Sequence, residues 1–218
     1  MTKEYRQLRF QPPKGAADLL LIRHGETEAA RPGVSFAMKD GQGDPALRPE
    51  GEAQAQRVAA RLADEPIDAI YVTKLRRTHQ TAAPLAERLG MTPVEHPDLH
   101  EIFLGDWDGG EYRIRAANRD PVFLRALEEG DYGVIPGAET TASLHARVKR
   151  GLFDIAATHP DQRVAVVVHG GVIGAALSLA TSAHVWAFGG AANGSISRLV
   201  IHEDRMILRG FNDVSHLD

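Results

Sequence analysis

Apolar residues along the chain follow two patterns that alternate with one another. Some runs are short and continuous, which is typical of strands covered on both faces. Other segments repeat their apolar residues every three or four positions, as one face of a helix does. The expected strands are Asp18–Ile22, Ile67–Val72 and Val164–Val168, and the expected helices are Glu50–Asp64, Thr78–Leu89, Ser143–Ala157 and Val172–Leu179.

The remaining segments carry weaker patterns. Thr92–Glu95 predicts one more short strand, and Ser197–Ile201 with Met206–Phe211 predict a closing pair. Residues Glu101–Ala138 are rich in Gly, Asp, Pro and aromatic residues and have no clean period. We therefore expect a surface loop there, with one short helix around Val122–Leu127.

The repeated order of strand and helix predicts an α/β sandwich with a largely parallel sheet. The 218 residues fit one domain, so residues 1–218 are expected to form a single unit. Within it we expect a polar N-terminal extension at 1–16 and an inserted cap or loop at about 105–140. Segment Gly33–Ala46 has glycines, a proline and mixed charges, which predicts a mobile flap with weak order.

Charge and composition exclude several classes of protein. The 25 basic and 29 acidic residues give a net charge of −4, which argues against nucleic acid or an anionic membrane as a partner. Cysteine is absent, so a disulfide framework, a thiolate nucleophile and a Cys-ligated metal are impossible. No apolar run is long enough to cross a bilayer and no secretory signal is evident, so a cytoplasmic location is the expectation.

Two histidines follow the two strongest expected strands directly. Arg23, His24 and a glycine come after the first, and His169 with Gly170 comes after Val164–Val168. Because the carboxyl ends of parallel strands carry the binding site, both imidazoles are expected at one edge. Arg77 follows a third strand toward the same edge. Two guanidinium groups and two imidazoles in an acidic protein predict a pocket for one phosphate group.

Eight ordered blocks resemble the histidine phosphatase superfamily, also called the phosphoglycerate mutase-like family. LLLIRHGETE resembles its nucleophile motif, and VVVHGGVI its second-histidine motif. Between them, LRPEGEAQA, YVTKLRRTHQTA, LHEIFLGDWDGGEY and PGAET resemble further family segments, and NGSIS and FNDVSHL resemble its tail. The resemblance spans about Leu19 to Leu217. It implies a three-layer α/β/α sandwich with a mostly parallel central sheet, of the phosphoglycerate mutase-like type.

The resemblance also implies roles for individual residues. His24 would be the nucleophile that forms a phosphohistidine, with one ring nitrogen donating to a backbone carbonyl. Arg23, Arg77 and His169 would surround the phosphoryl oxygens, and Glu101 would act as the general acid and then as the base. No metal and no cofactor is implied, because the arginines supply the positive charge.

Several residues have a second interpretation. Thr27 is expected either to contact the phosphoryl group, as Gly170 would, or to cap a helix near Glu28. A His24, His169 and Glu101 metal site is formally possible, although two arginines would repel a cation. Asp106 and Asp108 compete with Glu101 for the acid role. Aromatic residues Trp107 and Tyr112 either line the pocket or bury a loop. The arginines at 113, 115 and 119 either contact an acidic substrate or form an exposed basic helix face, and the exposed face is favoured.

Hydrolysis is favoured over phosphoryl transfer within the substrate. Glycolytic mutases of the family carry a serine and an asparagine where this chain has Thr27 and Ala30, and the segment after Glu101 is acidic rather than basic. The expected function is a metal-independent phosphomonoester hydrolase that acts on a small phosphorylated metabolite. A phosphoglycerate mutase is the alternative, a non-catalytic binder of phosphorylated ligands is a weaker one, and a homodimer is plausible.

Overall fold

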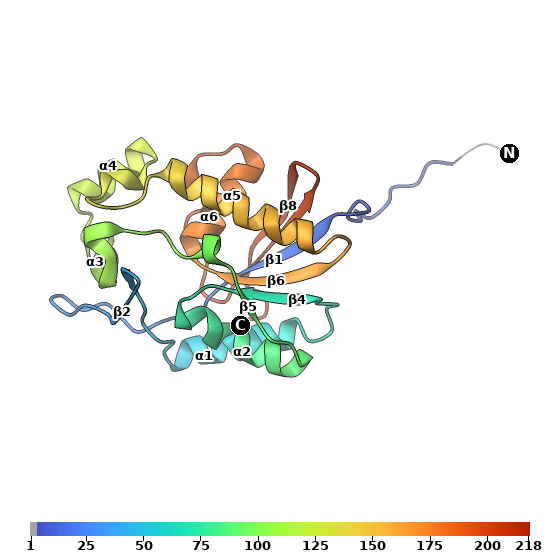
Figure 1. Ribbon diagram of the computed structural model, residues 1–218, viewed down its shortest axis with the longest axis horizontal. Coiled ribbons are helices and arrows are strands. Elements are labelled where there is room, and N and C mark those ends of the chain that lie inside the picture. The colour runs from blue at the N-terminus through green and yellow to red at the C-terminus, as the bar shows by residue number, and fades with distance from the viewer. Residues whose placement is uncertain (1–3) are drawn as a thin grey trace.

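The computed structural model describes residues 4–218, and a six-stranded sheet lies at its centre (Figure 1). The strand order is β5-β4-β6-β1-β7-β8. Strands β5, β4, β6 and β1 run parallel to one another, whereas β7 is antiparallel to β1 and β8 is antiparallel to β7. The strands are β1 (Ala17–Arg23), β4 (Ala69–Val72), β5 (Val94–Glu95), β6 (Arg163–Val168), β7 (Ile196–His202) and β8 (Arg205–Asp213).

Helices cover both faces of this sheet. Alternate residues of β1 point to opposite sides, so Leu20 and Ile22 pack in one core cluster and Leu19 and Leu21 in the other. The first cluster includes residues of α1 (Pro49–Arg61) and α2 (Arg76–Leu89), and the second includes residues of α5 (Thr141–Thr158) and α6 (Gly170–Thr181). The expected three-layer α/β/α sandwich is thus confirmed (Figure 1).

The register between β1 and β6 sets the position of the functional residues. The parallel pairing places Arg23 opposite Val168, the last residues of the two strands. His24 and His169 therefore leave the sheet at the same edge, and the backbone N–H of His24 donates to the Val168 carbonyl at 3.0 Å. Strand β4 lies on the other side of β6 and leads toward α2 at that same edge.

The segment between Glu101 and Ala138 contains more structure than expected. Helix α4 (Pro121–Glu129) corresponds to the expected short helix, but α3 (Glu111–Ala117) is a second one, so the prediction of a single helix is wrong. A helix of seven residues has too few turns to show a period in the sequence. Short 3-10 turns surround these helices, at η1 (Pro97–Leu99), η2 (Gly105–Gly110) and η3 (Tyr132–Val134).

Segment Gly33–Ala46 forms a small β-hairpin beside α3. Its strands are β2 (Met38–Lys39) and β3 (Gln42–Gly43), which pair in antiparallel register. The amide of Phe36 donates to the Gly109 carbonyl at 2.9 Å, so the hairpin contacts η2. Weak order in this segment without ligand stays a prediction.

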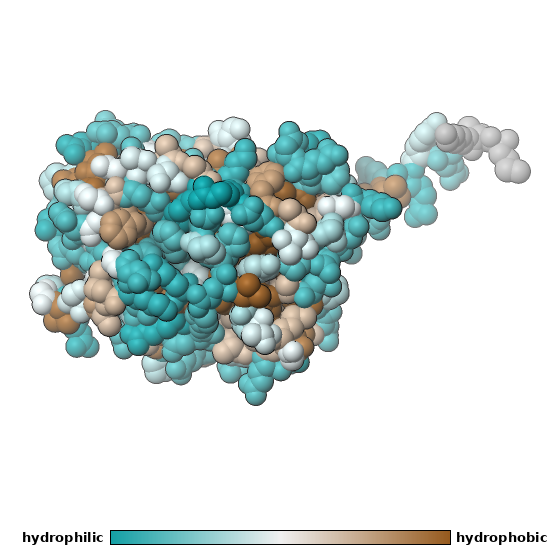
Figure 2. Space-filling model, in the orientation of Figure 1, coloured by the Kyte–Doolittle hydropathy of each residue, from teal (hydrophilic) through white to brown (hydrophobic). Residues whose placement is uncertain are grey.

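The first strand begins at Ala17, and residues 4–16 before it form no helix or strand. Residues 1–3 of the expected extension lie outside the described residues. On the face shown in Figure 2, hydrophilic side chains cover most of the surface and apolar ones form small, separate areas. Across residues 4–218, no helix combines the length and the apolar character needed to span a bilayer.

Candidate active site

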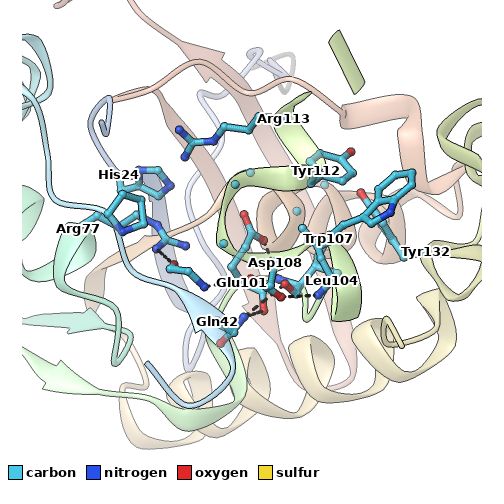
Figure 3. Close-up of a pocket in the computed structure, with 18 of the residues that line it drawn as sticks. His24, Gln42, Arg77, Glu101, Leu104, Trp107, Asp108, Tyr112, Arg113 and Tyr132 are labelled. Carbon is cyan, nitrogen blue, oxygen red and sulfur yellow. Dashed lines mark hydrogen bonds between the residues drawn. The ribbon is translucent and has the colours of Figure 1, made fainter. Parts of the chain in front are cut away.

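A cavity of about 260 Å³ opens at the carboxyl ends of the parallel strands. Arg23, His24, Arg77, Glu101 and Gly170 line it, so five of the seven predicted site residues contribute to its wall (Figure 3). His169 lies beside this wall and is fully buried, with its ring centroid 5.3 Å from that of His24. We call Arg23, His24, Arg77 and His169 the polar end of the cavity.

His24 presents one ring nitrogen to the cavity as a free base. Its Nδ1 lies 2.8 Å from the Gly25 carbonyl, which can only accept, so Nδ1 carries the proton and Nε2 keeps its lone pair. This is the backbone contact expected from the sequence. Burial lowers the pKa of His24 well below its usual value, and the charges of Arg77 and Arg23 lower it further. The imidazole is therefore neutral near pH 7.

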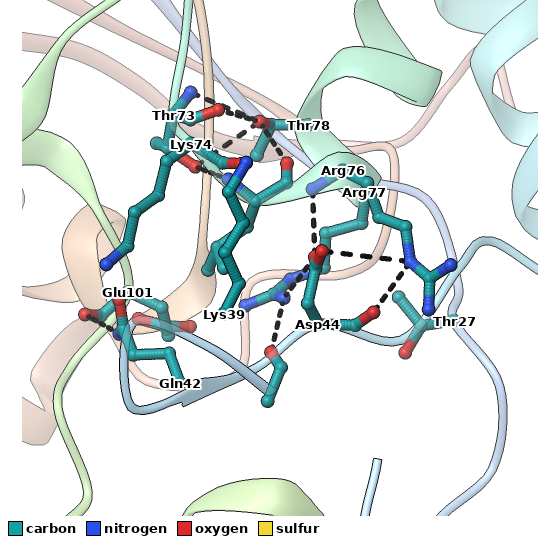
Figure 4. Close-up of polar contacts among 12 residues, drawn as sticks. Thr27, Lys39, Gln42, Asp44, Thr73, Lys74, Arg76, Arg77, Thr78 and Glu101 are labelled. Atoms are coloured by element: carbon teal, nitrogen blue, oxygen red, sulfur yellow. Dashed lines mark hydrogen bonds and ion pairs between the residues drawn. The ribbon is translucent and has the colours of Figure 1, made fainter. Parts of the chain in front are cut away.

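A pair of threonines, Thr73 and Thr78, lies beside His169 and was not singled out in the sequence analysis; Figure 4 shows the pair. Thr78 can give its hydroxyl hydrogen to the Leu75 carbonyl at 2.8 Å, while Thr73 lies 3.0 Å from Nε2 of His169. Oγ1 of Thr73 and Nε2 of His169 share one hydrogen bond, and Nδ1 is the ring nitrogen that is left without a partner. Burial lowers the pKa of His169 well below its usual value, followed by the charge of Arg77, so this ring is neutral too.

The two arginines of the polar end are fixed by backbone carbonyls. Arg23 is the last residue of β1, and its Nη1 donates to the Ala191 carbonyl. Arg77 lies in the first turn of α2, and its Nη1 donates to the Gly43 carbonyl at 3.0 Å, with Asp44 4.0 Å away (Figure 4). Burial lowers the pKa of Arg77 to about 10, although Glu101 and Asp44 oppose the shift, so the group stays charged at neutral pH.

Three buried nitrogen atoms of the polar end have no hydrogen-bond partner among residues 4–218. They are Nε of Arg23, Nε of Arg77 and Nδ1 of His169. A buried donor without a partner is costly, so such groups usually mark a place where a ligand supplies the acceptor. These three nitrogens, arranged around the free lone pair of the His24 ring, match the oxygen atoms of a tetrahedral oxyanion.

Glu101 lies farther into the cavity and is held through its backbone. The Glu101 carbonyl accepts from Nε2 of Gln42 at 2.7 Å and from Nη2 of Arg147 at 3.1 Å. Arg147 belongs to α5 and also forms an ion pair with Glu139 at 2.5 Å. A Cβ on Gly171 would clash with Cδ1 of Ile102 and come within 2.7 Å of Oε1 of Glu101, so glycine at this position lets α6 pack closely against both side chains. In Figure 3 the carboxylate stands between His24 and the aromatic side chains.

Thr27 takes a place that the sequence did not predict. It forms an isolated bridge with Leu47 and no helix begins at Glu28, so the helix-cap interpretation is wrong. Its Oγ1 accepts from Nη2 of Arg113 at 2.8 Å. Thr27 lines a neighbouring cavity, together with Arg23 and Arg113, and a direct contact with a phosphoryl group stays a prediction.

The segment after Glu101 adds residues that the sequence could not place. Arg113 is exposed, as expected, but it also lines the cavity at the polar end, unlike the outward-facing Arg115. Asp108 lines the cavity and Asp106 does not; the Asp108 carboxylate accepts from the amides of Gly43 and Leu104 at 3.0 and 2.8 Å. Burial raises the pKa of Asp108.

The two alternatives left open for the aromatic residues both apply. Trp107 is buried and Tyr112 half-buried, and both line the cavity.

The interpretation of His24, His169 and Glu101 as a metal site is not supported. Within residues 4–218, no three His, Asp or Glu side chains are grouped so that they could hold an ion. His24, His169 and Glu101 therefore do not form a set of ligands.

Comparison with known proteins gives a consistent result. The model of the histidine phosphatase superfamily (branch 1) matches residues 19–214. Phosphoserine phosphatase 1 of Hydrogenobacter thermophilus is 32% identical over 202 residues, which cover 91% of this chain and 93% of that protein. Phosphoglycerate mutase-like protein 4 of Arabidopsis thaliana is 35% identical over 163 residues, covering 72% and 68%.

A solved structure agrees with these relatives. The mycobacterial glucosyl-3-phosphoglycerate phosphatase superposes with a TM-score of 0.74 and 30% identity, and the match covers 90% of this chain and 99% of that one. The family model spans both strand-end histidines and nearly the whole sheet. The chain therefore belongs to branch 1 of the histidine phosphatase superfamily, whose members similar to it are named as phosphatases and as mutases.

Proposed function

We propose that this protein is a metal-independent phosphomonoester hydrolase that acts on a small phosphorylated metabolite through a phosphohistidine at His24. The observation that carries the proposal is the set of three buried, unpartnered nitrogens of Arg23, Arg77 and His169 around the His24 ring. They would donate to the three non-bridging oxygens of a phosphoryl group. The two guanidinium groups would supply the positive charge that a metal ion supplies in other phosphatases.

In the first step, Nε2 of His24 attacks phosphorus and the bond to the ester oxygen breaks. The hydrogen bond from Nδ1 to the Gly25 carbonyl orients the ring and stabilises the positive charge that develops on it. Glu101, as the neutral acid, gives its proton to the departing alkoxide. The products are the free alcohol and a phosphohistidine, with Glu101 left as a carboxylate.

In the second step, the Glu101 carboxylate removes a proton from a water molecule, which attacks phosphorus as the phosphorus–nitrogen bond breaks. Inorganic phosphate leaves, His24 is again neutral and Glu101 is again protonated. The anchors on the Glu101 backbone, Gln42 and Arg147, would keep the carboxyl group in place through both steps. General acid–base help of this kind is worth about 10²–10⁴-fold in rate.

Turnover of p-nitrophenyl phosphate in a chelator, combined with alkaline quenching of a ³²P-labelled intermediate, tests the proposal, because the phosphorus–nitrogen bond of phosphohistidine survives in base. We expect hydrolysis and a label on a peptide that contains His24, and both should disappear in His24→Ala. Transfer of the label to 2- or 3-phosphoglycerate without release of phosphate would instead support a mutase. A folded protein that binds phosphate and gives neither turnover nor label would be a non-catalytic binder.

A further inference from the structure

The cavity has a second end that the reaction steps do not use. Four aromatic residues line it, Trp107, Tyr112, Tyr132 and Trp186, and we call them the aromatic end. Figure 3 shows Trp107, Tyr112 and Tyr132 together on the side away from His24 and Arg77. The substrate's alcohol portion would have to extend in this direction, past Glu101.

The rings of the aromatic end hold one another in place. Tyr132 and Trp186 have ring centroids 4.6 Å apart, and Trp107 and Tyr112 have centroids 6.3 Å apart. Tyr112 also meets the edge of Phe123 at 5.9 Å. These residues come from η2, α3, η3 and η4 (Val185–Phe188), so four separate segments converge on one apolar wall. A wall that is packed in this way is preorganised and loses little side-chain entropy when it binds a ligand.

The surroundings of the aromatic end are largely apolar, with one buried donor, Nε1 of Trp186, that has no hydrogen-bond partner among residues 4–218. Burial raises the pKa of Tyr112 to about 12 and the pKa of Tyr132 well above its usual value, so both phenols stay neutral. Ile102, Leu104 and Val185 complete this part of the lining.

Charged side chains lie around the aromatic end, and the guanidinium of Arg115 lies over the Trp107 ring, 5.7 Å from its centroid. Arg113 donates to Thr27 and to the Glu28 carbonyl, and the Asp108 carboxylate accepts two backbone amides. The aromatic end itself contributes no charged side chain. It therefore offers a flat ring an aromatic surface to pack against, in which Tyr112 and Trp186 are half-buried and Trp107 and Tyr132 are buried.

We propose that the alcohol portion of the substrate carries a flat, apolar ring that packs against the aromatic end. This inference rests on the phosphatase function proposed above, since it assumes that the phosphoryl group occupies the polar end. Glu101 lies between the two ends, so its carboxyl group would meet the ester oxygen that joins phosphate and ring. The substrate class is thus a ring-bearing phosphomonoester.

The test compares three primary phosphate esters: benzyl phosphate, ethyl phosphate and phosphoserine. All three release a primary alkoxide, so differences in kcat/KM report mainly on the part beyond the ester oxygen. Burial of one ring is expected to raise kcat/KM for benzyl phosphate about 10- to 100-fold above that for ethyl phosphate. Benzyl phosphate should exceed phosphoserine by at least the same factor.

Trp186→Ala should lower the benzyl-to-ethyl ratio of kcat/KM about tenfold, because it removes one ring of the wall. Tyr112→Leu gives the same test through α3 if the first variant does not fold. Phe153→Ala is the matched control, since Phe153 lies on α5, does not line the cavity and contacts Lys149. The control should leave the ratio unchanged.

The outcomes separate this inference from the proposed function. Turnover of ethyl phosphate through a labelled His24, with a benzyl-to-ethyl ratio near one or with phosphoserine preferred, overturns the ring subsite and leaves the phosphatase intact. The ring subsite also fails if Trp186→Ala and Tyr112→Leu both keep the ratio of the wild type. Absence of turnover of all three esters, together with absence of label on His24, overturns the phosphatase itself.

Discussion

The two ends of the cavity are built from different kinds of structure. The polar end consists of side chains at or just beyond the ends of β1, β4 and β6, three neighbouring strands whose register is fixed by the sheet. The aromatic end consists of side chains from one short helix and three 3-10 turns, none of which pairs with the sheet. Both ends meet at Glu101.

This difference separates the chemistry from the choice of substrate. Strand register holds the polar end to within hydrogen-bond tolerances, which transfer of a phosphoryl group requires. The aromatic end depends on ring packing among short segments, which can change without disturbing the sheet. We therefore expect substitutions at the polar end to change the rate for every substrate, and substitutions at the aromatic end to change the ratio between substrates.

The largest effect should come from His24. His24→Ala removes the attacking nitrogen and is expected to lower kcat for p-nitrophenyl phosphate by about 10⁴-fold or more. Stopped assays with a thermal melt of the same preparation would distinguish loss of chemistry from loss of folding. A folded variant that retained a tenth of the wild-type rate would show that His24 is not the nucleophile.

The next effect should come from Arg77, where charge and shape both matter. Arg77→Ala should lower kcat/KM by about 10²–10³-fold for every ester tested, because a transition-state donor is lost. Arg77→Lys keeps the charge but lacks the planar fork, so it should recover only part of the rate. Arg88→Ala, on the exposed end of the same helix, is the control. Full activity in Arg77→Lys would contradict a role in orienting the phosphoryl oxygens.

A smaller effect is expected at Thr73, which acts through His169. Thr73→Val removes the hydroxyl that forms the hydrogen bond with Nε2 and should lower kcat about tenfold. Thr73→Ser keeps the hydroxyl and should restore the rate. The ¹⁵N shifts of the His169 ring should report a single tautomer in the wild type and in Thr73→Ser, and a mixture of tautomers in Thr73→Val. An unchanged ring spectrum in Thr73→Val would remove the positioning role.

The smallest effect concerns the pH dependence of stability. Because His24 and His169 have depressed pKa values when folded, the unfolded chain binds more protons below the ordinary value of 6.5. Their contribution is complete above that pH and is lost as the pH falls from 6.5 toward the folded-state values. The melting temperature should therefore fall between pH 7.5 and pH 5 in buffers without phosphate.

Each of His24→Asn and His169→Asn should reduce that fall by about 3 °C or more. Thr158→Ala, at an exposed position at the end of α5 with no titratable side chain, is the control and should keep the wild-type dependence. Equal slopes in all four proteins would show that neither buried imidazole resists protonation.

The same contrast explains how much the sequence could predict. His24 and His169 each follow a strongly apolar strand directly, so periodicity and the strand-end rule place both at one edge. Arg113 and Trp186 carry no such signal, because α3 is too short to show a period and Trp186 lies far along the chain in a 3-10 turn. Thr73 was missed for a different reason. Its role depends on the contact of its hydroxyl with the His169 ring, a residue far away along the chain, and only the three-dimensional structure shows that contact.

The hydrogen bond from Arg147 to the Glu101 carbonyl has a consequence for protein engineering. Arg147 belongs to the long helix α5 and donates to the Glu101 carbonyl, and an ion pair with Glu139 holds the Arg147 side chain in place. Both Arg147 and Glu139 lie outside the segment between Gly105 and Ala138. The backbone of Glu101 is thus held by α5 of the sandwich rather than by the segment between Gly105 and Ala138. We expect a chimera in which a foreign segment replaces residues 105–138 to keep the Glu101 proton donor in position. The scaffold could then be used to build phosphatases with other substrate specificities.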